Sequence, residues 1–298
     1  MRSSLWMKRA LPAVCLMLVG GASQGQAQVN LLERDQMIKY TAQNPYERFP
    51  DGRPKVPDAL IEKLKDLSAE DVWSVLESKG YHHQFEGNWQ ILHPGKKLVG
   101  RAFTVQYMPI RPDVSEVAEA EAKAKGLGAA SNQRAIDRLQ SGDVAVVDLN
   151  GKVEDNVFVG DNLAHYIMRT TRAGIVIDGG VRDLEGIAPM DMAGYIRGAH
   201  PGSGRVSMVT GVNVPVRIGN ATVMPGDVVF GDREGVYFIP PQFVAEIVKK
   251  AETTKLHDEW TKMKFDTGLY KSSDIYGSPK TPELKKEYEE YLKTHLGK

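Results

Sequence analysis

The sequence predicts a mixed α/β fold in which a parallel βαβ unit is joined to a run of strands. Two observations carry this prediction. Apolar strand patterns at residues 144–149 and 175–178 flank a helical pattern at 162–172, and this is the length of a βαβ unit. Residues 206–229 alternate short β-rich runs with Pro and Gly turns, without helices between them. The sheet is therefore expected to be mixed rather than doubly wound.

The composition is that of a globular chain with enough apolar residues for one sizeable core. It has 298 residues, of which 42% are hydrophobic, and 38 basic side chains balance 38 acidic ones. This balance argues against a nucleic-acid-binding protein with a broad basic face. The single cysteine excludes a disulfide framework and any zinc or iron–sulfur site built from cysteines.

The first residues have the pattern of a secretory signal peptide, residues 1–27. Arg2, Lys8 and Arg9 precede an apolar run, and small and polar residues follow it up to Ala27. The run is too short to cross a bilayer core of about 30 Å. We therefore expect cleavage near Ala27 and no membrane anchor. Export to a compartment such as a bacterial periplasm would suit a mature chain that keeps no cysteine.

The mature chain is expected to divide into an N-terminal arm at 28–57, a domain at 58–250 and a helical C-terminal extension at 251–298. Prolines break the arm, which leaves one short helix expected near residues 31–40. The charged, helical pattern of the two extensions fits either wrapping around another subunit or a solvated tail.

Periodicity and capping signals predict the elements of the domain. A helical spacing of apolar residues follows Pro57, and a capping box of Ser68 and Asp71 begins a second helix, which Gly80 ends. The helix of the βαβ unit is expected to be closed by Gly174. Further strands are predicted at residues 98–106 and 236–239, and further helices at 116–125 (or a solvated loop), 243–260 and 285–296.

Two segments at the ends of the predicted βαβ strands carry the candidate site. The sequence GDNL at 160–163 opens a helix, whose first N–H groups stabilise an anion such as a carboxylate. After the second strand, Arg182 offers a fork for a carboxylate, and Asp183 is an oxygen ligand suited to Mg²⁺ or Mn²⁺. Both turns belong to one sheet edge. The residues expected to face one cleft are Gly160, Asp161, Asn162, Leu163, Arg182 and Asp183.

Together these motifs resemble the RraA-like family, which includes regulators of ribonuclease E activity and class II 4-hydroxy-4-methyl-2-oxoglutarate aldolases. The spacing from GDNL to the Arg-Asp pair of VIDGGVRD carries the resemblance, with similar stretches at 98–105, 141–147, 225–232 and 235–240. It covers about residues 58–250. It implies a mixed-sheet β/β/α swivelling-domain core, here with helical N- and C-terminal extensions, and a homo-oligomer, either a trimer or a hexamer.

The resemblance implies a divalent-metal-dependent aldolase or decarboxylase that acts on small 2-oxo acids, such as 4-hydroxy-4-methyl-2-oxoglutarate or oxaloacetate, and releases pyruvate. The backbone of residues 160–163 and Arg182 would hold the carboxylate of the substrate, and Asp183 would carry Mg²⁺ or Mn²⁺. Asp161 would orient a water as proton relay while the cation stabilises an enolate. Asp161 and Arg182 are thus the expected catalytic residues.

The alternative is an exported RraA-like protein that binds a partner or a carboxylate without turning it over. Regulators of this family inhibit ribonuclease E by contact, but a signal peptide would separate this chain from that enzyme. Two residues depart from the family pattern and leave alternatives open. His165 either lines the pocket or faces solvent, and Glu234 either supplies an acid to a neighbouring subunit or lies in a surface turn.

Overall fold

The computed structural model describes residues 32–124, 126 and 131–296. The predicted signal peptide lies outside the described residues, so export stays a prediction. Within the part of the chain that is described, no helix is both long enough and apolar enough to cross a bilayer.

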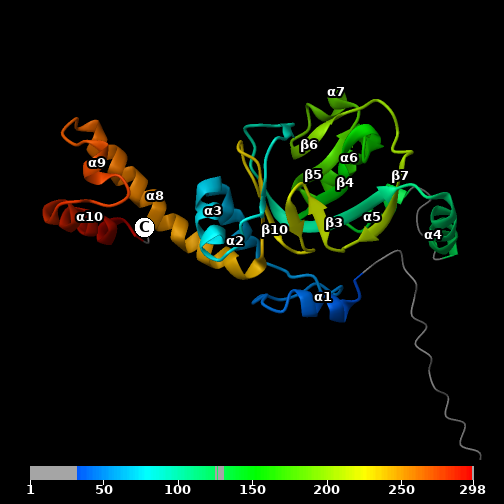
Figure 1. Ribbon diagram of the computed structural model, residues 1–298, viewed down its shortest axis with the longest axis horizontal. Coiled ribbons are helices and arrows are strands. Elements are labelled where there is room, and N and C mark those ends of the chain that lie inside the picture. The colour runs from blue at the N-terminus through cyan, green and yellow to red at the C-terminus, as the bar shows by residue number, and fades with distance from the viewer. Residues whose placement is uncertain (1–31, 125, 127–130, 297–298) are drawn as a thin grey trace, which may run out of the picture.

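Nine strands of the described residues form one mixed sheet, whose central strands run parallel (Figure 1). The parallel strands are β3 (Leu98–Pro109), β4 (Asp143–Val157), β5 (Gly174–Val181) and β6 (Ala193–Ala199). The antiparallel ones are β1 (Phe85–Glu86), β2 (Gln90–Ile91), β7 (Ser207–Val212), β10 (Val228–Gly231) and β11 (Val236–Ile239). The order is β1-β11-β10-β3-β4-β5-β6-β2, with β7 paired to β3. The predicted mixed α/β fold is confirmed.

The two faces of the sheet bury different partners. One face shares a core with α5 (Ser131–Ile136), α6 (Asp161–Thr171) and α7 (Leu184–Ile187). The opposite face packs against the hairpin of β8 (Val216–Ile218) and β9 (Ala221–Val223). A further layer on β10 and β11 consists of α2 (Asp58–Lys63), η1 (Leu64–Asp66), α3 (Ala69–Ser78) and the start of α8 (Val244–Asp266). The remaining helices are α1 (Arg34–Tyr40), α4 (Pro112–Ala124), η2 (Pro241–Phe243), α9 (Ser272–Ile275) and α10 (Pro282–His295).

Several local predictions are confirmed. The Ser68 hydroxyl accepts from the Asp71 N–H, and the Asp71 carboxylate accepts from the Ser68 N–H, which is the capping box of α3. Gly80 follows this helix with a φ of 82°, a left-handed conformation that glycine adopts without cost. The strands β4 and β5 are parallel and joined by α6, as the βαβ pattern predicts.

The predicted role of Gly174 is wrong. Helix α6 ends at Thr171, and the residue that caps it, Arg172, takes the left-handed conformation itself, with a φ of 56°. Gly174 begins β5 instead, and a Cβ there would lie 2.1 Å from the Ala193 carbonyl oxygen and 2.8 Å from the side chain of Leu98. This glycine is required by the close approach of a neighbouring strand, a demand that the local sequence does not distinguish from a helix cap.

The two extensions differ in how they pack. In the N-terminal arm, α1 lies where a short helix was expected, and Arg53 is fully buried against the sheet. At the other end, α8 runs without a break across the boundary expected at residue 250. It forms a small separate core with α9 and α10 around Trp260, Ile275 and Leu284. Figure 1 shows these helices, in orange and red, projecting away from the sheet.

Asp227 makes the stability of the fold depend on pH. Its side chain is buried and accepts a hydrogen bond from the Met224 N–H at 2.8 Å, and burial raises its pKa from 3.8 to about 7. The raised pKa means that this group contributes stability that is fully present below pH 4 and is lost as pH rises through 7.

We therefore expect Asp227→Asn to be more stable than the wild type at pH 8, by about 2 kcal/mol, because the amide keeps an acceptor for Met224 and carries no charge. The difference should shrink towards pH 4, where the wild-type carboxyl is protonated. Urea denaturation of both proteins at pH 4.5 and pH 8 measures this. A stability difference that does not change with pH would contradict the prediction.

Candidate functional site

The first feature of the site is an excursion of β4, a segment that leaves the pairing with β5 and then returns to it. Asp148 pairs with Asp178, but the next partners are Lys152 with Gly179 and Val157 with Gly180, so the intervening residues of β4 leave the ladder. A Cβ on Gly179 would lie 2.5 Å from Leu149, and one on Gly180 would lie 3.0 Å from the Val153 carbonyl oxygen. The glycine pair of VIDGGVRD is therefore required by the chain that passes over it.

After this excursion, the two predicted site segments lie in direct contact. The Arg182 N–H donates to the Val159 carbonyl at 3.0 Å, which continues the strand ladder into the loops. Gly160 is the N-cap residue of α6. A Cβ on Gly160 would lie 2.3 Å from Asp183 Oδ2 and 3.0 Å from Arg182 Nε. Only glycine at position 160 leaves room for these two side chains at the start of the helix.

Arg182 and Asp183 form an accessible charged pair at this edge. Arg182 Nε lies 3.2 Å from Asp183 Oδ2, and the two side chains are 43% and 45% exposed. Asp183 caps α7 in the left-handed conformation, with a φ of 59°. Asp and Asn are the non-glycine residues that adopt this conformation most readily. The strained turn places a half-exposed carboxylate beside the guanidinium and Gly160.

The other predicted residues are held nearby in different ways. Asp161 Oδ1 accepts from the Asn162 N–H at 2.7 Å, and Asp161 Oδ2 would be 2.6 Å from a Cβ on Gly186, so this carboxylate packs against α7. Leu163 packs on the core of that face, whereas Asn162 is exposed. His165 is also exposed on α6, as the solvent alternative expects. Glu234 is likewise exposed and lies in the turn between β10 and β11, as the surface-turn alternative expects.

The donor set fits a divalent cation held by few protein ligands. Among the described residues, no group of three or more acidic, histidine or cysteine side chains could enclose a metal ion. The Asp183 carboxylate is half-exposed. Among the described residues, the side chain with which it forms a hydrogen bond is that of Arg182. Mg²⁺ keeps several waters and binds through one or two carboxylates, so a single aspartate at an open edge suits it.

A network around Arg197 supports the end of β5, and sequence reasoning missed it. Arg197 Nε donates to Asp178 Oδ1 at 2.6 Å, and Arg197 Nη2 donates to Glu86 Oε1 at 2.8 Å. The guanidinium carbon also lies 3.8 Å from the ring centre of Trp89. Arg197 thus ties β5, which leads into Arg182, to Glu86 in β1, a residue 111 positions from Arg197 in sequence. No local pattern signals such a pairing.

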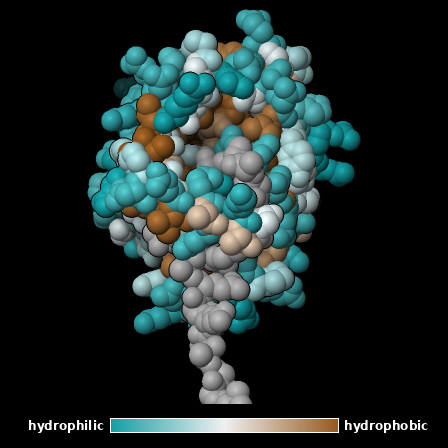
Figure 2. All heavy atoms as spheres, turned by 90° about the vertical axis from the view of Figure 1, so that its right-hand side faces the viewer, coloured by the Kyte–Doolittle hydropathy of each residue, from teal (hydrophilic) through white to brown (hydrophobic). Residues whose placement is uncertain are grey.

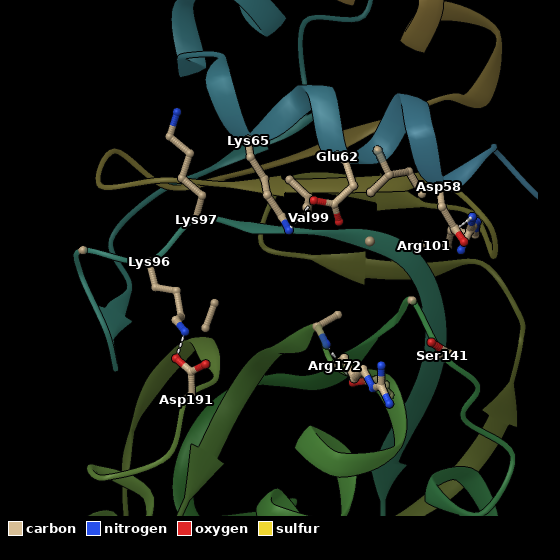
Figure 3. Close-up of a pocket in the computed structure, with 17 residues that line it drawn as sticks. Asp58, Glu62, Lys65, Lys96, Lys97, Val99, Arg101, Ser141, Arg172 and Asp191 are labelled. Atoms are coloured by element: carbon tan, nitrogen blue, oxygen red, sulfur yellow. Dashed lines mark hydrogen bonds and ion pairs between the residues drawn. The ribbon is translucent and has the colours of Figure 1, made fainter.

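A cavity of about 640 Å³ lies at the opposite edge of the sheet, where the parallel strands begin (Figure 3). Glu62 of α2 and Lys65 of η1 pair at 2.6 Å, and Lys96 pairs with Asp191. Arg172, at the carboxyl end of α6, lies on the other side. None of the six predicted site residues lines this cavity. Each of its three acidic side chains forms an ion pair with a basic one, and Lys97 and Arg172 leave an excess of positive charge. Ligands of open α/β sheets bind at the other edge.

Comparison of the sequence with known proteins finds relatives that match parts of this chain. Protein DlpA of Legionella pneumophila is 29% identical over 213 residues, which are 70% of this chain and 32% of that protein. A Halalkalibacterium halodurans protein named "Putative 4-hydroxy-4-methyl-2-oxoglutarate aldolase" is 28% identical over 126 residues, 42% of this chain and 60% of its own. The chain therefore spans less than two thirds of the length of both relatives.

Solved structures share the fold. RraAS2 of Streptomyces coelicolor, described as an unusual member of the RNase ES inhibitor RraA protein family, is 28% identical. It has a TM-score of 0.58, with 74% of this chain and 100% of that chain covered. An uncharacterized protein of Pseudomonas syringae pv. tomato has a TM-score of 0.59 at 24% identity, with 76% and 94% covered, and shows the same fold.

A family model extends this likeness to the sequence motifs. The model of RraA-like proteins, described as Aldolase/RraA, matches residues 56–238. The match covers more than half of the chain and includes both segments of the candidate site, 160–163 and 182–183. It also agrees closely with the range over which the motifs resemble that family. The chain belongs to the RraA-like family.

Proposed function

We propose that this protein is a divalent-metal-dependent class II aldolase or decarboxylase that acts on small 2-oxo acids of the 4-hydroxy-4-methyl-2-oxoglutarate or oxaloacetate type and releases pyruvate. The contact of Gly160 with Arg182 and Asp183 carries the proposal. It joins a helix N-terminus, a guanidinium and an accessible carboxylate at one sheet edge. The aldolase name of the relative from H. halodurans supports the substrate class.

Different residues at this edge would bind the substrate, hold the cation and transfer the proton. Arg182 and the N–H groups at the start of α6, apart from the Asn162 N–H that Asp161 accepts, would bind the carboxylate next to the keto group, because both favour an anion. Asp183 would hold Mg²⁺ or Mn²⁺. A divalent cation supplies, when bound, Lewis-acid stabilisation of negative charge on the 2-oxo acid. Asp161, oriented by the Asn162 N–H, would hold and return a proton through a water.

We propose further that the protein is exported and works as a homo-oligomer, a trimer or a hexamer. An exposed apolar face supports the homo-oligomer. It lies at the end of β3, on α4 and just before β7, and consists of Met108, Ile110, Val114, Val117 and Val206. Figure 2 shows apolar side chains gathered around a hollow on this side of the molecule. Such a patch supports burial against another copy. Export rests on the pattern of residues 1–27 alone.

Pyruvate release by the purified mature chain tests the function. We expect turnover of oxaloacetate and of 4-hydroxy-4-methyl-2-oxoglutarate in the presence of Mg²⁺ or Mn²⁺. Chelation with EDTA should abolish the turnover, and added metal should restore it, because the proposed site has only one carboxylate ligand. Absence of turnover with every metal would favour the non-catalytic alternative, in which the protein binds a partner or a carboxylate.

A further inference from the structure

The connection between β6 and β7 crosses the candidate site. β6 lies beside β5, whereas β7 pairs with β3, so residues 200–206 must pass the ends of β5 and β4 (Figure 1). The contacts follow this path. The His200 N–H donates to the Val181 carbonyl at 3.0 Å, a Cβ on Gly204 would lie 2.6 Å from the Val157 carbonyl oxygen, and the Val206 carbonyl accepts from Ile110 at 2.9 Å. This connection therefore forms a wall beside the residues that follow β4 and β5.

Within this wall, His200 is the neighbour of Arg182 in the sheet. Val181 is in register with Ala199, and the bond from His200 to Val181 extends this pairing by one residue. Arg182 extends the pairing of β5 with β4 in the same way, through its bond to Val159. Neighbouring strands lie about 4.8 Å apart, so the backbones of Gly160, Arg182 and His200 form a row about 10 Å long.

Backbone N–H groups hold the ring of His200 through one of its two nitrogens, Nδ1. Nδ1 accepts from the Gly202 N–H at 3.1 Å and from the Asp155 N–H at 3.3 Å. A neutral imidazole whose Nδ1 accepts carries its proton on Nε2. Nε2 has no hydrogen-bond partner in the part of the chain that the structure describes, and the side chain is 28% exposed. The structure thus presents a fixed, accessible N–H donor at the end of the row.

We propose that His200 is a specificity-determining residue that binds the second carboxylate of a 2-oxo dicarboxylate through Nε2–H. The proposal rests on the proposed function, in which Arg182 and the start of α6 hold the first carboxylate. A five-carbon dicarboxylate separates its two carboxylates by a length comparable to this row. An N–H donor to a carboxylate forms a charge-assisted hydrogen bond, which a 2-oxo monocarboxylate cannot use.

Two probes and two variants test this assignment by isothermal titration calorimetry of the mature chain in Mg²⁺. Pyruvate and 2-oxoglutarate share the 2-oxo acid head, and only the second has a further carboxylate. His200→Asn keeps an acceptor near the Nδ1 position for Gly202 and Asp155 but has no distal donor. We expect it to weaken 2-oxoglutarate binding by about tenfold or more and pyruvate binding by less than twofold. His200→Gln restores a distal donor and should lose less.

The outcomes separate this proposal from the function on which it rests. Wild-type protein that binds neither probe would overturn the 2-oxo acid site itself, and the role of His200 with it. Wild-type protein that binds both probes, combined with equal losses or no loss in His200→Asn, would overturn the role of His200 alone. A selective loss for 2-oxoglutarate, with partial recovery in His200→Gln, supports the assignment, because a merely structural role would weaken both ligands together.

Discussion

Asp183→Asn is expected to lower kcat/KM for a 2-oxo acid by about 10²- to 10³-fold, which is the usual effect of removing one group that stabilises charge in a transition state. The substitution removes the negative charge that would hold the metal. It keeps the size of the side chain and the left-handed backbone, since Asn adopts a φ near 59° as readily as Asp does. The melting temperature should therefore stay close to that of the wild type. Steady-state assays over a range of Mn²⁺ concentrations, together with thermal unfolding, measure both effects.

A neighbouring acid provides the matched control for this variant. Glu185 lies two residues further along, in α7, and is exposed. Glu185→Gln makes the same change of charge without touching Arg182 or Gly160, so we expect turnover within about twofold of the wild type. Turnover of Asp183→Asn at the level of Glu185→Gln, with unchanged dependence on Mn²⁺, would show that Asp183 holds no catalytic metal.

Arg53→Ala is expected to lower the free energy of unfolding by about 3–5 kcal/mol, the cost of breaking a buried ion pair by removing one partner. Arg53 and Asp143 are both fully buried, and Arg53 Nη1 lies 3.1 Å from Asp143 Oδ1. The guanidinium also lies over the rings of Phe49 and Phe103, at 4.8 and 5.1 Å from their centres. Its removal leaves a cavity and an unpaired buried carboxyl group in β4. Urea denaturation at pH 7 measures the loss.

Two further variants show whether the cost arises from the buried pair. Arg34 lies in the same arm, but its nearest acid, Asp35, is 3.8 Å away and both side chains are largely exposed. Arg34→Ala should change the stability by less than about 0.5 kcal/mol. Combining Arg53→Met with Asp143→Asn removes both charges and should be less destabilising than Arg53→Ala. A loss in Arg53→Ala no greater than in Arg34→Ala would mean that the arm contributes little to the core.

Much of the fold could be predicted because it depends on local patterns. The apolar runs of β4 and β5, with the helical spacing of α6 between them, are visible in a short window of sequence. The capping box at Ser68 is another such signal, since its donors and acceptors lie within three residues. The spacing between GDNL and the Arg-Asp pair likewise follows from one βαβ unit, and the structure brings Gly160 into contact with Arg182 and Asp183.

Features that depend on distant segments could not be predicted. Gly174 was expected to close α6, yet it serves the close approach of β6, whose path no local pattern reveals. The pairing of Arg53 with Asp143 joins residues 90 positions apart, and the pairing of Arg197 with Glu86 joins residues 111 apart. An isolated arginine in the sequence looks the same whether its partner is water or a buried carboxylate.

By itself, the sequence determined the βαβ unit, most of the longer helices and the family to which the chain belongs, but it gave no sign of the central strand β6. These follow from propensity, periodicity and short motifs, all of which act over a few residues. Only the tertiary structure decided which further segment lies beside these two turns at the candidate site. The passage of residues 200–206 across β5 and β4, which places His200 beside Arg182, arises because β7 pairs with β3 and not with its predecessor. Such pairing is set by the packing of the whole sheet, and no short stretch of sequence encodes it.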